Sequence, residues 1–418
     1  MKLFYLAFKY RFTQIASYLR HHTVVQHIKK PSSVLLIDSD GFSNYTSYLA
    51  RGLSRYCDVI LYGLSYQSYN ITGASRQKRI KFYYLKKRLP KEYSALRGLV
   101  RVFILFFILL NALFRTKYDL VHIQEHLPTF FLFIPMLKLR KKKICWTLHD
   151  VEIFAPATGF FGKMRLLFLR IVSQPSLMAK SADDIIVHAE SLKKQLIAKG
   201  IDENKLHVVR HFDYRYLLED NLLQTKSTEE LPNNYVLFFG NIAPWKGVEV
   251  LIEASKIVRT QVGKKFDLVI AGEPYEGYDN IPFFEGLDER DCGYIKTLRR
   301  YITNPEICDI ISNSSFLVLP YNNTFQSSAS GVVPLAYTFS KPVIVSNVPS
   351  LVEYVEHGKT GFIFETNNSR KLANYIIELV NNSTKCANMG KEAFQKLNEG
   401  MSLEKCSHDT WMVYCRVK

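Results

Sequence analysis

Short apolar runs alternate with amphipathic stretches along most of the chain, and most runs end at a polar or glycine-containing loop. Runs of about four to eight apolar residues predict buried strands, and the amphipathic stretches between them predict helices. We expect strands, with their following loops, at residues 33–38, 57–61, 119–126, 141–150, 184–188, 207–209, 235–240, 266–271, 316–320 and 341–345. Strands that alternate with helices form parallel sheets covered on both faces, so the pattern predicts doubly wound α/β domains.

Two such domains and a final helix account for the 418 residues. We place the first domain at residues 1–212 and the second at residues 233–400. Residues 213–232 between them are acidic and polar, which is typical of a linker. Residues 401–418 predict a helix, and its Trp411, Met412 and Tyr414 would allow it to pack back on the first domain.

Basic residues are concentrated in the first half of the chain. Residues 1–200 contain 32 Lys and Arg against 11 Asp and Glu, a net charge of +21, and residues 201–418 contain 23 against 27, a net charge of −4; the two halves together give +17. The first half is therefore expected to face an anionic partner. Its basic residues alternate with long aliphatic and aromatic runs, which favours a membrane surface over nucleic acid.

Two apolar segments are candidates for the membrane contact, and neither predicts a membrane span. Residues 1–30 carry only basic charges and form either a basic interfacial helix or an irregular arm packed on the domain. Residues 102–114 are the most hydrophobic segment, but a span needs ~20 residues. This segment is either a helix buried in the core or a helix that dips into one leaflet.

The cysteine pattern indicates the compartment. The seven cysteines form no CxxC pair and no Cys/His cluster, as expected for free thiols in a reducing environment. Together with the charge pattern, this predicts a cytoplasmic protein that is peripherally associated with the cytoplasmic membrane.

Polar and glycine residues follow several predicted strands, at the sheet edge where doubly wound domains bind ligands. In the first domain these residues are Gly41, Asn44, Tyr45, Glu125, His149, Asp150 and His188. In the second domain a turn from Gly240 to Gly247 contains Lys246, and Gly272 follows the next strand. These positions are the first candidates for a ligand site.

The stretch 316–362 contains a strand, a polar loop, a short helix expected at 331–339 and another strand. Pro334 falls in or beside the first turn of this helix, where backbone N–H groups lack partners in any case. The N–H groups behind the serines of the loop and Gly331 would form an anion cradle that suits a nucleotide diphosphate. The alternative is an ordinary strand-loop-helix crossover.

Several of these motifs resemble a known family. The pattern strand-Gly-x(5)-Lys-Gly-x(3)-Leu-Ile at residues 240–252 resembles the donor-site turn of family-4 glycosyltransferases. Residues 268–272 also resemble this family. Residues 147–150 (Thr-Leu-His-Asp) resemble the acceptor-side histidine loop of that family. Residues 185–191 are also similar to the family, and residues 341–362 look like its closing segment. The resemblance covers residues 32–400.

The resemblance implies the GT-B fold, in which two doubly wound domains face each other across a cleft that holds the active site. The first domain would bind the acceptor and the second a UDP- or GDP-linked sugar. The resemblance also implies transfer with retention at the anomeric carbon, with no metal and no other cofactor. The sequence contains no DxD pair placed as such a metal site; Asp38-Ser39-Asp40 has the spacing but lies in the first loop of the acceptor half.

Carried over position by position, the resemblance implies three sets of site residues. The catalytic residues would be His149, Asp150 and Lys246. The donor-binding residues would be Gly240, Asn241, Lys246, Gly272, Gln326, Ser327, Ser330, Gly331 and Val332. The acceptor-binding residues would be Gly41, Asn44, Tyr45, Glu125 and His188.

This sequence departs from the family pattern in the donor loop. The two glutamates usual in that loop would fall on Ser327 and Leu335, so both are absent. The loop instead resembles a subgroup with a serine-glycine sequence, and Asn241 stands where an Arg is common. We therefore expect main-chain donors at residues 330–332, helped by Gln326 or Ser327, to hold the diphosphate.

These features predict a hexosyltransferase that extends a lipid-linked glycan for a surface polysaccharide at the inner membrane surface. One alternative is a GT-B nucleotide-sugar epimerase, which would not need a basic, apolar acceptor half. The other is a degenerate transferase that serves as a membrane scaffold, which the missing glutamates would permit. The sequence leaves the sugar, the nucleotide, the linkage and the oligomeric state open.

Overall fold

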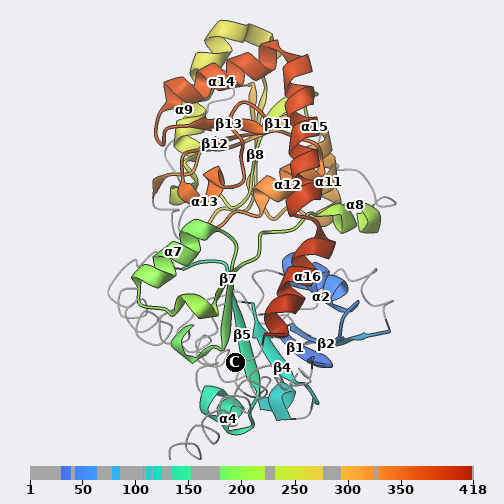
Figure 1. Ribbon diagram of the computed structural model, residues 1–418. Coiled ribbons are helices and arrows are strands. Elements are labelled where there is room, and N and C mark those ends of the chain that lie inside the picture. The colour runs from blue at the N-terminus through green and yellow to red at the C-terminus, as the bar shows by residue number, and fades with distance from the viewer. Residues whose placement is uncertain are drawn as a thin grey trace, which may run out of the picture.

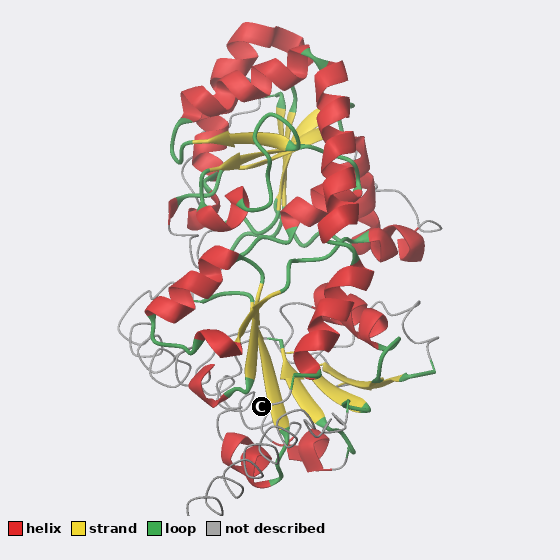
Figure 2. Ribbon diagram, viewed as in Figure 1, coloured by secondary structure: helices red, strands yellow, loops and turns green. Residues whose placement is uncertain are grey.

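The chain forms two parallel sheets, one above the other, each flanked by helices (Figures 1 and 2). The computed structural model describes residues 30–38, 43–63, 78–84, 107, 110–114, 116–124, 133–151, 179–221, 231–275, 293–323 and 328–416. Both sheets have the strand order of a doubly wound fold, in which the first strand lies in the middle and later strands extend to either side. The predicted α/β class is confirmed.

The first sheet has seven parallel strands in the order β3-β2-β1-β4-β5-β6-β7. They are β1 (Ser33–Asp38), β2 (Asp58–Gly63), β3 (Ile80–Tyr84), β4 (Leu120–Ile123), β5 (Lys143–Leu148), β6 (Asp184–Val187) and β7 (Leu206–Val208). The helices around it include α2 (Ser43–Leu53), α4 (Ile134–Leu139), α7 (Glu190–Ala198) and the 3-10 turn η3 (Glu203–Lys205).

The second sheet has six parallel strands in the order β10-β9-β8-β11-β12-β13. They are β8 (Tyr235–Phe239), β9 (Leu268–Ala271), β10 (Ile295–Leu298), β11 (Ser314–Leu319), β12 (Val343–Ser346) and β13 (Gly361–Phe364). The accompanying helices are η4 (Pro244–Lys246), α9 (Val248–Val262), η5 (Gly263–Lys265), α11 (Asn304–Asn313), α12 (Val332–Thr338), α13 (Pro349–Val352), α14 (Ser369–Asn381) and α15 (Ser383–Gly400).

Strand β1 shows why the central strands are continuously apolar. Val34 and Leu36 belong to one buried cluster, and Leu35 and Ile37 belong to a second cluster on the other face of the sheet. Successive side chains of a strand point to opposite faces, so a strand covered on both sides must be apolar at every position. The first cluster also contains buried residues of the second domain, so the two domains share an apolar core region.

The pattern did not predict β3, β10 and β13, and all three are edge strands. Strand β13 is apolar but only four residues long, whereas β3 and β10 include exposed positions. In β3, Ile80 is buried while the next residue, Lys81, is exposed. In β10, three of the four side chains are partly exposed. An edge strand is covered less completely and tolerates charged side chains, so it lacks the apolar run by which a central strand is recognised.

The chain passes between the two domains twice, and Asp213 in the first crossing forms hydrogen bonds with the second crossing, near Met401. Its N–H donates to the Met401 carbonyl (2.8 Å), and its carboxylate accepts from the Leu403 N–H (3.1 Å) and the Arg215 guanidinium (2.6 Å). The segment expected as a plain linker, 213–232, contains helix α8 (Arg215–Asn221), which packs on α11 of the second domain. Part of that segment is therefore ordered structure.

The final helix, α16 (Leu403–Tyr414), lies beside α2 on the first domain (Figure 1). The Tyr414 hydroxyl bonds to His122 Nδ1 inside this domain, and Trp411 stacks on Tyr56 with ring centroids 5.8 Å apart. Met412, which was expected among the packing residues, is 52% exposed. The helix thus packs through one side, and Met412 lies on the other.

None of the helices in the described part of the chain is long and apolar enough to cross a membrane. Of the segment 1–30, expected as an interfacial helix or a packed arm, all but residue 30 lies outside the described residues. Of the apolar segment 102–114, the described residues divide between two environments: Ala112 and Leu113 are buried, whereas Phe107 and Phe114 are 62% and 54% exposed.

Candidate active site

The loop after β5 meets the donor loop of the second domain. Asp150 and Ser328 form an antiparallel bridge, and the Ala329 N–H donates to the His149 carbonyl at 3.4 Å. The acceptor-side histidine loop and the serine-glycine loop are therefore joined through their main chains. This contact brings together two groups of predicted site residues from opposite domains.

Three buried histidines lie behind this contact. His149 follows β5, His188 follows β6 and His211 lies beyond β7, with exposed fractions of 4%, 0% and 4%. Their rings are 3.9 Å (His188 to His211), 4.7 Å (His149 to His188) and 5.6 Å (His149 to His211) apart between centroids. Tyr45 meets all three rings edge-on, and stacks on Phe212 at 4.5 Å.

Burial controls the protonation of this cluster. It lowers the pKa of His188 to about 4 and the pKa of His211 well below its ordinary value. The His188 Nδ1 hydrogen bond to the Val209 carbonyl opposes this effect without reversing it. Both imidazoles are therefore neutral at physiological pH, because a charge there would lose its hydration.

The three imidazoles are also potential metal ligands, since one nitrogen of each lies within 4.8 Å of the others. In the described geometry, however, both nitrogens of His188 take part in hydrogen bonds, one with Val209 and one with His149 (3.1 Å). A metal would have to displace the proton shared by the two rings. The absence of a metal from the reaction stays a prediction.

Lys246 lies at the start of the second domain, in η4. Its ammonium is 3.9 Å from the centroid of the Tyr321 ring. Desolvation lowers the pKa of Lys246 to about 7, and the Asp150 carboxylate of the other domain opposes this shift. The next residue, Gly247, has a φ of 63°, and a Cβ there would come within 2.0 Å of the Pro320 carbonyl oxygen. Glycine thus allows the turn to approach the end of β11 and to aim Lys246 at the donor loop.

The glycines after β8 and β9 bring the donor turn together. A Cβ on Gly272 would be 1.9 Å from the Gly240 carbonyl oxygen, so these two turns can touch only through glycine. A Cβ on Gly240 would lie 3.8 Å from a methyl group of Val332 at the start of α12. Gly240, Gly272 and Val332 are therefore neighbours, as predicted for one site, while Asn241 is exposed beside them.

The donor loop differs from the predicted cradle in one respect. The Ser330 hydroxyl accepts from the Val332 N–H (3.3 Å) and shares a hydrogen bond with Tyr321 Oη (3.2 Å). One of the main-chain donors expected for the diphosphate is therefore already bonded. Gly331 has an ordinary helical φ of −71°, but a Cβ there would lie 2.8 Å from Tyr214 Oη. Close contact with Tyr214 is thus one reason for glycine at this position.

The predicted acceptor residues that the structure describes are not well placed to bind an acceptor directly. The side-chain amides of Asn44 and Asn304 bond reciprocally at 3.0 and 3.3 Å, so Asn44 contacts the second domain. Tyr45 and His188 are buried and contact the histidine cluster, which leaves them no surface for an acceptor. In this geometry they support His149 instead of binding an acceptor directly. Gly41, Glu125, Gln326 and Ser327 lie outside the described residues.

Two residues of the second domain, Glu353 and Tyr354, were not predicted. The Glu353 carboxylate accepts from the N–H groups of Glu190 (2.7 Å) and Ser191 (2.8 Å) at the start of α7. The Tyr354 hydroxyl donates to the His188 carbonyl (2.7 Å) and accepts from the His211 N–H (3.2 Å). They belong to the closing segment, but nothing local in the sequence shows that they reach across to the other domain.

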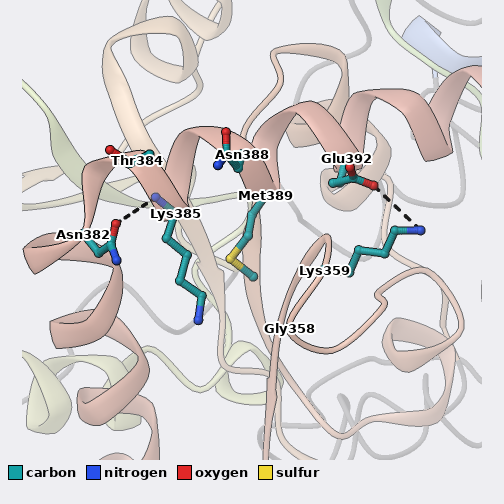
Figure 3. A pocket seen from close by; sticks show the side chains of 8 residues that line it. All are labelled: Gly358, Lys359, Asn382, Thr384, Lys385, Asn388, Met389 and Glu392. Carbon is teal, nitrogen blue, oxygen red and sulfur yellow. Dashed lines mark hydrogen bonds and ion pairs between the residues drawn. The ribbon is translucent and has the colours of Figure 1, made fainter.

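A separate hollow of about 510 Å³ lies at the start of α15 (Figure 3). Its lysines are already paired, Lys359 with Glu356 and Glu392, and Lys385 with Glu378. The Lys385 N–H is capped by the Asn382 side chain. The hollow therefore offers little for a charged ligand.

Comparison with known proteins agrees with the two-domain arrangement. The model described as Glycosyltransferase Family 4 matches residues 39–212, and the model described as Glycosyl transferases group 1 matches residues 220–396. The capsular polysaccharide biosynthesis glycosyltransferase CapM of Staphylococcus aureus is 27% identical over 233 residues, which are 53% of this chain and 58% of CapM. The GDP-mannose:glycolipid 4-beta-D-mannosyltransferase of Xanthomonas campestris pv. campestris is 30% identical over 132 residues, 31% of this chain and 35% of that protein.

A solved structure with the same architecture is that of Anabaena Alr3699/HepE in complex with UDP and glucose. It superposes with a TM-score of 0.63 at 16% identity and covers 91% of this chain and 98% of that one. The fold is thus GT-B, and the chain belongs to the family-4 type of GT-B glycosyltransferases. It is an enzyme of the hexosyltransferase class.

Proposed function

We propose that this enzyme transfers a hexose, with retention, from a UDP- or GDP-sugar to a lipid-linked glycan during surface polysaccharide synthesis. The observation that carries the proposal is the main-chain contact between the His149-Asp150 loop and the Ser328-Ala329 loop. This contact supports a single site between the domains, made of the acceptor-side histidine, the donor loop and Lys246. The names of CapM and of the glycolipid mannosyltransferase support a capsular or glycolipid product.

The donor side suits a leaving nucleoside diphosphate. Negative charge builds up on the diphosphate as the glycosidic bond breaks, so catalysis needs a cation fixed beside it. Lys246 supplies this charge, and a diphosphate next to it would raise its lowered pKa and keep it protonated. The complex of HepE with UDP and glucose supports a nucleotide-sugar as the donor.

The acceptor side suits an anionic membrane surface. Helix α4 and the turn after it expose Leu139 (85%) together with Lys138, Arg140 and Lys141. Lys138 is paired with Asp183 (2.9 Å), so the net positive charge of this surface comes from Arg140 and Lys141. The Arg140 guanidinium lies 5.4 Å from the ring of Phe114, which is itself exposed. We call Phe114 and residues 138–141 the basic-apolar surface. Apolar side chains next to cations are the combination that binds at an anionic lipid interface.

The test is a transfer assay with a panel of UDP- and GDP-sugars and a polyprenyl-diphosphate glycan acceptor. We expect one sugar to be transferred, and NMR of the product to show the same anomeric configuration as the donor. Lys246→Ala and His149→Ala are the controls, and both should transfer the sugar more slowly than the wild type. Release of an isomerised nucleotide-sugar without transfer would indicate an epimerase, and binding without turnover would indicate a scaffold; either would overturn the proposal. An inverted product would overturn retention alone.

A further inference from the structure

The hydrogen bonds of His188 fix the positions of its protons. Nδ1 lies 2.7 Å from the Val209 carbonyl oxygen, and a carbonyl can only accept, so Nδ1 carries a proton. Burial keeps this imidazole neutral, with a pKa of about 4. Nε2 of His188 therefore carries the lone pair and acts as an acceptor.

The same argument continues to His149. Its Nδ1 lies 3.1 Å from His188 Nε2. Because His188 Nε2 is the acceptor, the proton between the two rings belongs to His149 Nδ1. With its proton on Nδ1, an uncharged His149 ring carries its lone pair on Nε2. One backbone carbonyl in the first domain thus sets the proton positions of two histidines in turn.

Contacts from both domains hold His188 in this place. The Tyr354 hydroxyl of the second domain donates to the His188 carbonyl at 2.7 Å. Tyr45 of α2 contacts the His188 ring edge-on at 5.3 Å, and the His211 ring lies 3.9 Å away on another side. Because these contacts fix the ring, the bond to His149 has a defined direction, which a solvated histidine would not offer.

We infer that His188 is a positioning residue for sugar transfer: it holds His149 in the tautomer whose Nε2 accepts a hydrogen bond from a hydroxyl group of the sugar donor. This inference rests on the proposed placement of His149 in the transfer site. In the opposite tautomer, Nε2 of His149 would carry the proton. It would then donate a hydrogen bond to the sugar hydroxyl, and the hydroxyl would have to turn its oxygen toward the ring. His188 therefore does not touch the substrate in this assignment but acts through His149.

The direct test is the ¹⁵N NMR spectrum of the histidine rings in the full-length protein. In the wild type we expect His149 to show a protonated Nδ1 and a lone-pair Nε2. His188→Phe keeps a planar ring of similar size and removes both hydrogen bonds, so the His149 tautomers should mix or reverse. His188→Gln retains an acceptor for His149 and should preserve the wild-type pattern in part. A protonated Nε2 in the wild type, or an unchanged His149 in His188→Phe, would overturn the inference.

His211→Phe is the matched control for loss of packing. It makes the same substitution in the same buried cluster, and His211 Nδ1 has no hydrogen-bond partner among the described residues. We expect it to leave the His149 tautomer unchanged. If His211→Phe and His188→Phe alter His149 equally, general loosening of the cluster explains the effect and the assignment is wrong.

Kinetics connect the tautomer with the reaction. Hydrogen-bond partners that orient a metal-ligating histidine are worth ~10- to 100-fold in activity when removed, and we expect the same range for a residue that orients His149. His188→Phe should lower kcat/KM by that factor, and His188→Gln should recover part of it. A sugar donor that lacks the hydroxyl bound by His149 should have a lower kcat/KM than the complete donor with the wild type. This difference in kcat/KM should be smaller with His188→Phe. If the wild type transfers no sugar at all, the proposed function is wrong. The NMR spectrum tests the tautomer of His149 separately, because it does not depend on sugar transfer.

Discussion

Glu353 of the second domain caps a helix of the first domain, because its carboxylate accepts from the N–H of Ser191 at 2.8 Å and from the neighbouring N–H of Glu190 at 2.7 Å. A carboxylate at a helix N-terminus bonds to unpaired donors and interacts favourably with the helix dipole. Arg210 lies 3.8 Å from the same carboxylate. The contact joins the domains close to His188, which lies two residues before the start of α7 along the chain.

We therefore expect Glu353→Gln to weaken domain closure. Loss of the charge should cost ~1–2 kcal/mol of contact between the domains. Small-angle scattering should show a larger radius of gyration without ligand, and the donor KM should rise. Glu356→Gln is the control, because Glu356 pairs with Lys359 and Lys396 inside the second domain. Equal behaviour of the two variants would mean that Glu353 does not control closure.

Lys246→Ala should lower turnover by ~10- to 100-fold with the fold intact, since one charge-assisted hydrogen bond is worth ~1.5–3 kcal/mol. Steady-state kinetics at saturating donor measure the effect, and circular dichroism checks the fold. Lys256→Ala on α9 is a suitable control, because Lys256 lies on an exposed part of that helix. Normal kinetics of Lys246→Ala would remove this residue from the site.

The lowered pKa of Lys246 also predicts that donor binding takes up a proton. The free group has a pKa of about 7, and an adjacent diphosphate raises it. Below pH 7 the lysine is already charged; above pH 7 binding must add the proton, so affinity should fall by up to ~10-fold per pH unit. Titration calorimetry of a UDP- or GDP-sugar in buffers of different ionisation enthalpy should show little uptake at pH 6 and close to one proton at pH 8.

Lys246→Arg separates this effect from other titrations. Arginine stays protonated throughout this range, so the variant should show no proton uptake even if its affinity is lower. His188 and His211 do not titrate between pH 6 and 8, because burial lowers the pKa of each. Uptake that persists in Lys246→Arg would assign the proton to another group.

The sequence predicted the central strands and the donor turn, because both are local. A strand such as β8 is apolar at every position, and Lys246 lies in a glycine turn whose spacing is characteristic by itself. The contacts that complete the site are not local: Glu353 and Glu190 are 163 positions apart, and Asn44 and Asn304 are 260 apart. They depend on how two folded domains meet, so no pattern within one segment predicts them. For the same reason His188 was expected to bind acceptor, although packing from Tyr45, His211 and Tyr354 buries it.

Gly331→Ala tests how the donor loop binds the diphosphate. Glycine here leaves room both for Tyr214 Oη, 2.8 Å from a Cβ at this position, and for a phosphate that approaches the main chain. We expect the substitution to weaken UDP or GDP binding markedly, and Gly331→Val to weaken it further. Removal of the Ser327 hydroxyl should cost only ~1 kcal/mol.

The double variant Gly331→Ala, Tyr214→Phe distinguishes the two causes. If the loss arises from the Tyr214 hydroxyl, the second substitution removes the clash and restores binding. If the phosphate approaches Gly331 itself, the loss remains, which is the result we expect. Equal losses from the Ser327 and Gly331 variants, or none from Gly331→Val, would place the phosphates elsewhere.

The last prediction concerns the membrane. The basic-apolar surface should bind vesicles of phosphatidylglycerol and phosphatidylethanolamine at low salt, and the binding should weaken as salt rises, because each cation near the lipid contributes ~1 kcal/mol through a screened interaction. Leu139 is 85% exposed, and its transfer into lipid contributes ~1.5–3 kcal/mol. Leu139→Asp should therefore lower the affinity at least ~10-fold, as measured by vesicle flotation.

Met412→Asp is the matched control, since Met412 is an exposed apolar residue of α16, outside this surface. Equal loss in both variants would show that general charge, and not this surface, governs binding, and a wild type that stays in solution at low salt would contradict membrane association altogether.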